Sequence, residues 1–209
     1  MKFISIMNNN VIMNSSIELI IGPVCSGKTT ELIRRLKCAA AINQKCIYIT
    51  HVNDNRPVEK VINNEESGLY SHLTKDQKAL IYYAKKEDSL SDINKNNELT
   101  EYSLIGIDEG QFFNDLITYV DYFCRILGKR VIVAGLNGDY KRKCFGQIHF
   151  LLPLCDDILH LSAICVRCAK KGKMTKAPFS HRLINSEEQI DVGGIDKYEP
   201  LCRKCYDEA

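Results

Sequence analysis

The sequence has no long hydrophobic run and no long block of charge of one sign. None of its apolar stretches approaches the ~18 residues that suggest a membrane-spanning helix. Its 28 Lys and Arg residues nearly balance its 26 Asp and Glu residues, which leaves a formal net charge of +2. Proteins that bind DNA or an anionic membrane through bulk charge carry a clearer basic excess. We therefore expect neither direct DNA binding nor membrane association.

Residues 1–15 lack the apolar core that a signal peptide needs, and we expect them to form a disordered N-terminal extension. The chain contains ten cysteines, which in a small secreted protein would suggest disulfides. Six of them are scattered, whereas the other four form two C-x-x-C pairs near the C-terminus. This division indicates reduced thiols plus a metal site. The sequence therefore predicts a cytoplasmic protein.

Short apolar segments alternate with segments of helical periodicity. Apolar residues at helical spacing predict helices over residues 29–41 and 114–127, and Gly128 provides a C-cap for the second. Four nearly continuous apolar segments predict strands over residues 17–21, 46–50, 103–107 and 131–135. Such strands, separated by helices, predict an α/β fold with a mostly parallel sheet covered on both faces.

Residues 22–29, Gly-Pro-Val-Cys-Ser-Gly-Lys-Thr, fit the phosphate-binding pattern G-x-x-x-x-G-K-[ST], with a predicted strand before and a helix after. The glycines let backbone N–H groups surround phosphate oxygens, and the helix N-terminus adds a positive dipole end. Lys28 would contact the β- and γ-phosphates of ATP, and the Thr29 hydroxyl would ligate Mg²⁺. A glycine-rich turn without a ligand is the alternative. The predicted phosphate site comprises Gly22, Pro23, Val24, Cys25, Ser26, Gly27, Lys28, Thr29 and Thr30.

Asp108 and Glu109 follow directly after the apolar segment 103–107. Ligands of open α/β sheets bind at this end of the strands. An acid there can hold Mg²⁺ through water, and its neighbour can act as a base or position a nucleophile. Two acids at a solvated strand end are common by chance, but the phosphate-binding pattern favours the catalytic interpretation.

The two C-x-x-C pairs, Cys165 with Cys168 and Cys202 with Cys205, offer the four thiolates of a tetrahedral zinc site. Four sulfur ligands leave no open coordination position, so the predicted Zn²⁺ is structural. Redox-active pairs or unbound cysteines are the alternatives. Because the chain becomes Lys-rich and poor in apolar runs in this region, we place a domain boundary near Ala163. The predicted units are residues 16–163, which bind nucleotide, and residues 164–209.

Four motifs together resemble those of the type II thymidine kinases, in the order of that family. They are G-P-V-C-S-G-K-T-T-E-L, I-G-I-D-E-G-Q-F-F, V-I-V-A-G-L-N-G-D-Y-K-R-K-C-F-G and G-G-I-D-K-Y. The resemblance implies a RecA-like P-loop NTPase fold with a small zinc-binding lasso domain over residues 164–209. It implies transfer of the γ-phosphoryl group of ATP to the 5′-hydroxyl of thymidine, with deoxyuridine as a further substrate. Feedback inhibition by dTTP and a homotetramer are also implied.

The resemblance also implies roles for individual residues. Glu109 matches the catalytic base, and Asp54 and Arg56 resemble a D-x-R element near the phosphates and magnesium. Magnesium would then be held by Thr29, Asp108 and Asp54. Residues matched to the nucleoside site and its lasso are Phe112, Leu136, Tyr140, Phe145, Thr175, Ile190, Val192 and Tyr198. Core packing is the alternative for the aromatic residues, since one of Phe112 and Phe113 must face the core.

Two other functions fit parts of the sequence. A P-loop ATPase acting on nucleic acid would use Glu109 to activate water, and a zinc-dependent binding module would use its nucleotide site for regulation. The near-neutral net charge and the Q-F-F sequence after Glu109 favour the kinase.

Overall fold

A parallel β-sheet forms the centre of the computed structural model, which describes residues 15–54, 81–83, 89–94, 98–184, 188–189 and 197–209. Within these residues the sheet has six strands in the order β3-β2-β4-β5-β1-β6, and every neighbouring pair is parallel. The strands are β1 (Ser16–Gly22), β2 (Cys46–Ile49), β3 (Ile81–Tyr83), β4 (Leu104–Ile107), β5 (Arg130–Leu136) and β6 (Asp157–His160). The predicted α/β fold with a parallel sheet is confirmed.

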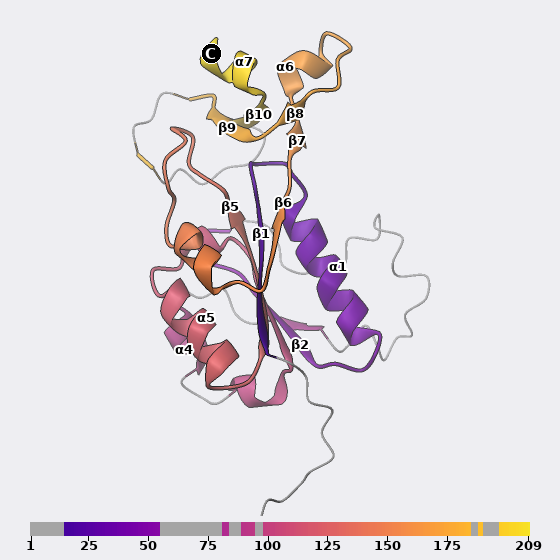
Figure 1. Ribbon diagram of the computed structural model, residues 1–209, viewed down its shortest axis with the longest axis vertical. Coiled ribbons are helices and arrows are strands. Elements are labelled where there is room, and N and C mark those ends of the chain that lie inside the picture. The colour runs from indigo at the N-terminus through magenta and orange to yellow at the C-terminus, as the bar shows by residue number, and fades with distance from the viewer. Residues whose placement is uncertain (1–14, 55–80, 84–88, 95–97, 185–187, 190–196) are drawn as a thin grey trace, which may run out of the picture.

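Helices cover both faces of the sheet (Figure 1). Helix α1 (Lys28–Ala40) packs on one face, and α5 (Leu116–Arg125) packs on the other with the 3₁₀ helix η5 (Ile148–Leu154). Side chains of adjacent strand residues point to opposite faces of the sheet. Leu19 belongs to the core cluster under α5, and its neighbour Ile20 belongs to the cluster under α1. Shorter helices are α4 (Leu90–Asn94), η3 (Glu98–Glu101) and η4 (Gly110–Phe112).

The four predicted strands and two predicted helices are present, with shifted ends. Helix α5 begins at Leu116, two residues later than predicted, because the backbone of Asp115 is not helical. Gly128 follows its end with φ of 65°. The sequence did not reveal β3 or β6. Both lie at the sheet edges, and the edge strand β6 is mostly exposed, so no continuous apolar run marks it.

The C-terminal region has a small core of its own. Its antiparallel strands are β7 (Ala163–Ile164) with β8 (Lys176–Ala177) and β9 (Phe179–Arg182) with β10 (Tyr198–Leu201). Two short helices, α6 (Val166–Ala169) and α7 (Arg203–Asp207), complete it. A buried cluster of Ala163, Cys165, Ala177, Leu201, Cys202 and Cys205 joins β7, β8, β10 and α7. The domain boundary near Ala163 stays a prediction.

Within the described part of the chain, no helix is both long enough and apolar enough to cross a membrane. All ten cysteines are free thiols. Residues 1–14 of the predicted N-terminal extension lie outside the described residues.

Candidate active site

A pocket of about 380 Å³ lies at the C-terminal ends of the central strands. The segments after β1, β2, β4 and β5 all contribute to it, which is the edge where ligands bind in open α/β sheets. Strand β9 and the start of β10 contribute from the C-terminal region. The lining residues are Val24, Cys25, Ser26, Gly27, Lys28, Thr29, Thr30, Asn53, Asp54, Glu109, Gln111, Phe112, Leu136, Gly138, Asp139, Tyr140, Phe145, Ser180, Gln189 and Tyr198.

The predicted phosphate-binding loop depends on two glycines for its shape. A Cβ at Gly22 would lie 2.6 Å from the Ser26 Oγ and 2.7 Å from the Leu161 carbonyl oxygen, so no larger residue fits. Gly27 has φ of 85° at the start of α1. Cys25 is also left-handed, with φ of 58°, which is uncommon for a residue with a side chain. These conformations curl the chain before the helix N-terminus.

Lys28 lies beneath this loop and is only 8% exposed. Its Nζ donates a hydrogen bond to the Pro23 carbonyl oxygen at 2.7 Å, which holds the ammonium close to the curled backbone. Residues 24–30 line the pocket, whereas Gly22 and Pro23 are buried behind it. The loop therefore brings a cation and a helix N-terminus to one side of the pocket, an arrangement suited to phosphate.

Asp108 is the buried acid at the end of β4, and its carboxylate is firmly held. Its Oδ2 accepts hydrogen bonds from the Thr29 hydroxyl and the Tyr48 hydroxyl, each at 2.8 Å. Its Oδ1 accepts one from the backbone N–H of Glu109 at 3.0 Å. Because Thr29 donates its hydroxyl proton to Asp108, its oxygen would meet a cation through a lone pair and not through the proton.

Asp54 supplies a second buried carboxylate and lines the same pocket. The Thr50 hydroxyl donates to its Oδ2 at 3.1 Å. Thr29 lines the pocket as well and is hydrogen-bonded to Asp108, which is not itself a lining residue. All three residues offer hard oxygen donors, the kind of ligand that Mg²⁺ prefers. Arg56, the other member of the predicted D-x-R element, lies outside the described residues.

Glu109 adopts a left-handed backbone conformation with φ of 51° and lines the pocket. The Gln111 Nε2 donates to its Oε2 at 2.6 Å, and the Gln111 Oε1 accepts the backbone N–H of Leu136 at 3.1 Å. The buried amide thus links the carboxylate to the end of β5, and the Leu136 N–H fixes which amide atom faces Glu109. Gln111 was not among the residues predicted from sequence.

Aromatic side chains form another wall of the pocket. The rings of Phe112 and Phe145 pack edge to face, with centroids 5.7 Å apart and an interplanar angle of 88°. Leu136 and Tyr140 line the pocket beside them. Phe113 is fully buried in the core cluster under α5, so the two neighbouring phenylalanines divide as expected between pocket and core. Such a wall suits a flat ring.

The residues predicted for the lasso are only partly brought together. Tyr198 lines the pocket, and its hydroxyl accepts a hydrogen bond from Arg182 at 2.6 Å. Thr175 is among the described residues but does not line the pocket. Its carbonyl oxygen accepts a hydrogen bond from the Cys165 N–H within the C-terminal region. Ile190 and Val192 lie outside the described residues.

Strand β9 provides the contacts that sequence reasoning missed. Ser180 lines the pocket, and its hydroxyl accepts the Val24 N–H of the phosphate-binding loop at 3.0 Å. The Arg182 guanidinium lies 3.8 Å from the ring centroid of Tyr140. Both polar residues are buried and alternate with the partly exposed Phe179 and His181. This is the reverse of the burial that apolar and polar alternation predicts, so no local pattern marks these contacts.

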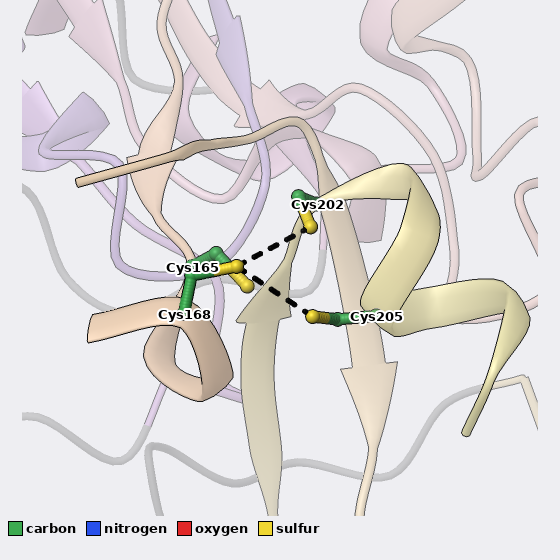
Figure 2. A group of neighbouring side chains, drawn as sticks. All are labelled: Cys165, Cys168, Cys202 and Cys205. Carbon is green, nitrogen blue, oxygen red and sulfur yellow. Dashed lines mark hydrogen bonds between the residues drawn. The ribbon is translucent and has the colours of Figure 1, made fainter. Parts of the chain in front are cut away.

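The four predicted zinc ligands converge within the C-terminal region, which we call the zinc-binding region (Figure 2). Their sulfur atoms all lie within 4.8 Å of one another. The Cys168 Sγ lies 3.8 Å from that of Cys202 and 3.7 Å from that of Cys205. Ligands about 2.3 Å from a tetrahedral zinc ion are separated by about 3.8 Å, so the cluster fits Zn²⁺.

The acidities of these thiols also fit a cation. Burial opposes ionisation of Cys165, but hydrogen bonds from the backbone N–H groups of Cys202 and Cys168 outweigh it and lower its pKa to about 7. Burial and the neighbouring thiols raise the pKa of Cys205 to about 12. Zinc binds cysteines as thiolates, so binding of the ion at this cluster would release protons from its thiols.

Known proteins resemble the chain over nearly its full length. A family model described as thymidine kinase matches residues 15–206. The thymidine kinase of fowlpox virus (strain NVSL) is 42% identical over 193 residues, covering 92% of this chain and 97% of that protein. That of Amsacta moorei entomopoxvirus is 43% identical over 196 residues, covering 93% and 99%. That of vaccinia virus (strain Ankara) is 40% identical over 190 residues, covering 91% and 96%. The resemblance inferred from the motifs is confirmed, and the chain belongs to the thymidine kinase family.

Proposed function

We propose that the protein transfers the γ-phosphoryl group of ATP to the 5′-hydroxyl of thymidine, giving dTMP. The observation that carries the proposal is that one pocket is lined by the phosphate-binding loop, by Glu109 and by the aromatic wall of Phe112 and Phe145. A nucleoside whose base packs on that wall would direct its sugar toward Glu109 and the phosphate loop. The relatives that match are named for this activity.

In this proposal Glu109 is the general base. It accepts the proton of the 5′-hydroxyl as that oxygen bonds to the γ-phosphorus and the bond to the β-phosphate oxygen breaks, with ADP leaving. Gln111 holds the Glu109 carboxylate in place, and Lys28 stabilises the negative charge on the transferring group. Thr29, Asp108 and Asp54 would hold Mg²⁺, which supplies further positive charge at the phosphates.

The same pocket supports the proposed inhibition by dTTP. Its phosphate-binding and aromatic walls are continuous, so one molecule that carries both thymine and a triphosphate could occupy both. Deoxyuridine, which lacks only the thymine methyl group, would bind by the same contacts.

We also propose that residues 16–163 bind nucleotide and that residues 164–209 form the zinc-braced lasso. The ten free thiols are consistent with a cytoplasmic location.

A homotetramer is supported by exposed apolar residues at one edge of the sheet. Ile158 of the edge strand β6 is 44% exposed, and Phe150 of the adjoining η5 is 56% exposed. An exposed strand edge with apolar side chains offers a surface on which another chain can pair. Native mass measurement would give the oligomer size directly.

Phosphorylation of a panel of nucleosides tests the proposed function. Purified protein with ATP and Mg²⁺ is expected to phosphorylate thymidine and deoxyuridine and to leave purine nucleosides unchanged. A matched reaction contains single- or double-stranded DNA without nucleoside. ATP consumption that depends on DNA and not on thymidine would overturn the kinase proposal in favour of a nucleic-acid-dependent ATPase.

Zinc loss is expected to affect the nucleoside more than ATP. In Cys168→Ser a hydroxyl replaces a thiolate, so the cluster should lose its metal and the folding energy that the metal contributes. We expect weaker thymidine binding and lower thermal stability, with ATP binding largely kept. Metal analysis with separate titrations of ATP and thymidine measures this, and Cys38→Ser, an exposed cysteine on α1, is the control. Absence of zinc from reduced wild-type protein, or equal loss of both ligands, would contradict it.

A further inference from the structure

Helix α7 contacts the loop that follows β5. The Tyr206 hydroxyl donates a hydrogen bond to the backbone carbonyl oxygen of Tyr140. The Arg142 guanidinium lies 4.6 Å from the ring centroid of Tyr206, and its Nη1 lies 3.0 Å from the Asp207 Oδ1. Tyr206 directly follows the zinc ligand Cys205. The contact therefore joins the zinc-binding region to a loop of the main sheet.

This loop lines the pocket with four residues, Gly138, Asp139, Tyr140 and Phe145. The buried carboxylate of Asp139 organises it from within, since its Oδ1 accepts the N–H groups of Lys141 at 2.9 Å and Lys143 at 2.8 Å. Arg142 lies between them with φ of 61°, a conformation that a residue with a side chain keeps only when its surroundings hold it. The Tyr206 contact is one such external support.

The contact acts on the nucleoside side of the pocket. Tyr140 lies in the loop after β5, whereas the phosphates of ATP are assigned to the loop after β1. The ring of Tyr140 is further fixed by the Arg182 guanidinium stacked on it. Moving the Tyr140 backbone would therefore shift an aromatic wall of the pocket and leave Lys28 where it is.

We propose that Tyr206 is a positioning residue that holds Tyr140 against the nucleoside site, so that α7 of the zinc-binding region sets nucleoside affinity through the loop of residues 137–145. The inference rests on the proposed function, because the nucleoside is the ligand affected. It differs from a lasso that merely closes over the pocket, since the effect passes through a loop of the main sheet. Loss of one such hydrogen bond typically changes an equilibrium by roughly three- to tenfold.

The variant Tyr206→Phe tests this position, since it removes the hydroxyl and keeps the ring. We expect KM for thymidine to rise roughly three- to tenfold, with KM for ATP and zinc content unchanged. Amide exchange at Lys141 and Lys143, followed by NMR, is expected to accelerate because their loop loses its support. Lys204→Ala is the matched control on the same helix, as its side chain is 81% exposed and lies 3.9 Å from Glu208.

A second variant approaches the contact from the loop. Arg142→Gln removes the guanidinium that contacts Tyr206 and Asp207 without changing any residue of the zinc-binding region, and KM for thymidine should rise in the same direction. If Tyr206→Phe loses its zinc, the KM of Arg142→Gln for thymidine decides whether the contact sets nucleoside affinity. Unchanged KM for thymidine in a zinc-loaded variant, or an equal rise in both KM values, would overturn the proposal.

The exchange measurement separates this inference from the proposed function. If the wild-type protein does not phosphorylate thymidine, the proposed function fails, yet the support of the loop by Tyr206 is still tested by exchange at Lys141 and Lys143. Unchanged exchange rates in Tyr206→Phe would then refute it.

Discussion

Replacing Glu109 by Gln is expected to lower kcat for thymidine by about 10²–10⁴-fold, the usual worth of a general base. The amide cannot accept the proton of the 5′-hydroxyl. The substitution keeps the size of the side chain, and the new amide oxygen can still accept the hydrogen bond from Gln111. Fold, thermal stability and ATP affinity should therefore remain near wild type.

Steady-state kinetics with an independent ATP titration measures this effect. Glu101→Gln is a suitable control, because Glu101 is an exposed glutamate paired with Lys45 at 3.1 Å. The control should keep its kcat. A Glu109→Gln protein with near-normal turnover would remove Glu109 from the mechanism and return the search for the base to the other acids that line the pocket.

Replacing Lys28 by Ala is expected to weaken ATP binding and to lower kcat by about 10²–10³-fold, the range seen when one preorganised charge-stabilising donor is lost. Lys28 is buried under the phosphate-binding loop and bonded to the Pro23 carbonyl oxygen, so no solvent cation can take its place with the same geometry. The β- and γ-phosphates of bound ATP would lose the Lys28 ammonium, and so would the phosphoryl group during its transfer.

Thermal denaturation with and without ATP provides a direct measurement, because a ligand that binds only the folded state raises the midpoint. The midpoint of wild type should rise with ATP, and that of Lys28→Ala should rise little. Lys45→Ala, at an exposed ion pair, is the control. Unchanged ATP affinity and rate in Lys28→Ala would show that this loop is not the phosphate site.

The features that the sequence revealed are contiguous in the chain. The phosphate-binding pattern, the pair Asp108-Glu109 and each C-x-x-C pair carry their chemistry within a few neighbouring residues, and the covered central strands are continuous apolar runs. The roles assigned to these residues stay predictions. Residues 24–30 and Glu109 line one pocket, Asp108 accepts a hydrogen bond from Thr29, and the four sulfur atoms converge on one point, all of which agree with those assignments.

What the sequence did not reveal depends on the register of distant segments. In the parallel pairing of β2 with β4, Tyr48 lies opposite Gly106, which precedes Asp108 by two residues. This register brings the Tyr48 hydroxyl within hydrogen-bond distance of the Asp108 carboxylate. Gln111 links Glu109 to β5 only once that strand lies alongside. Ser180 reaches the phosphate-binding loop from a part of the chain more than a hundred residues away. Such contacts leave no local pattern.

The backbone at Glu109 has a further consequence for how this protein can be improved. Left-handed conformations cost a residue with a side chain about 1 kcal/mol or more, and Glu109 and Cys25 both adopt one at the pocket. Glycine would relieve the strain at Glu109, but it would also delete the carboxylate. That deletion would also leave the buried Gln111 amide without its acceptor, at a cost of about 1–3 kcal/mol, which is as large as the strain relieved. Selection for heat resistance therefore has little to gain from glycine at this position, and the strained backbone is retained together with the carboxylate.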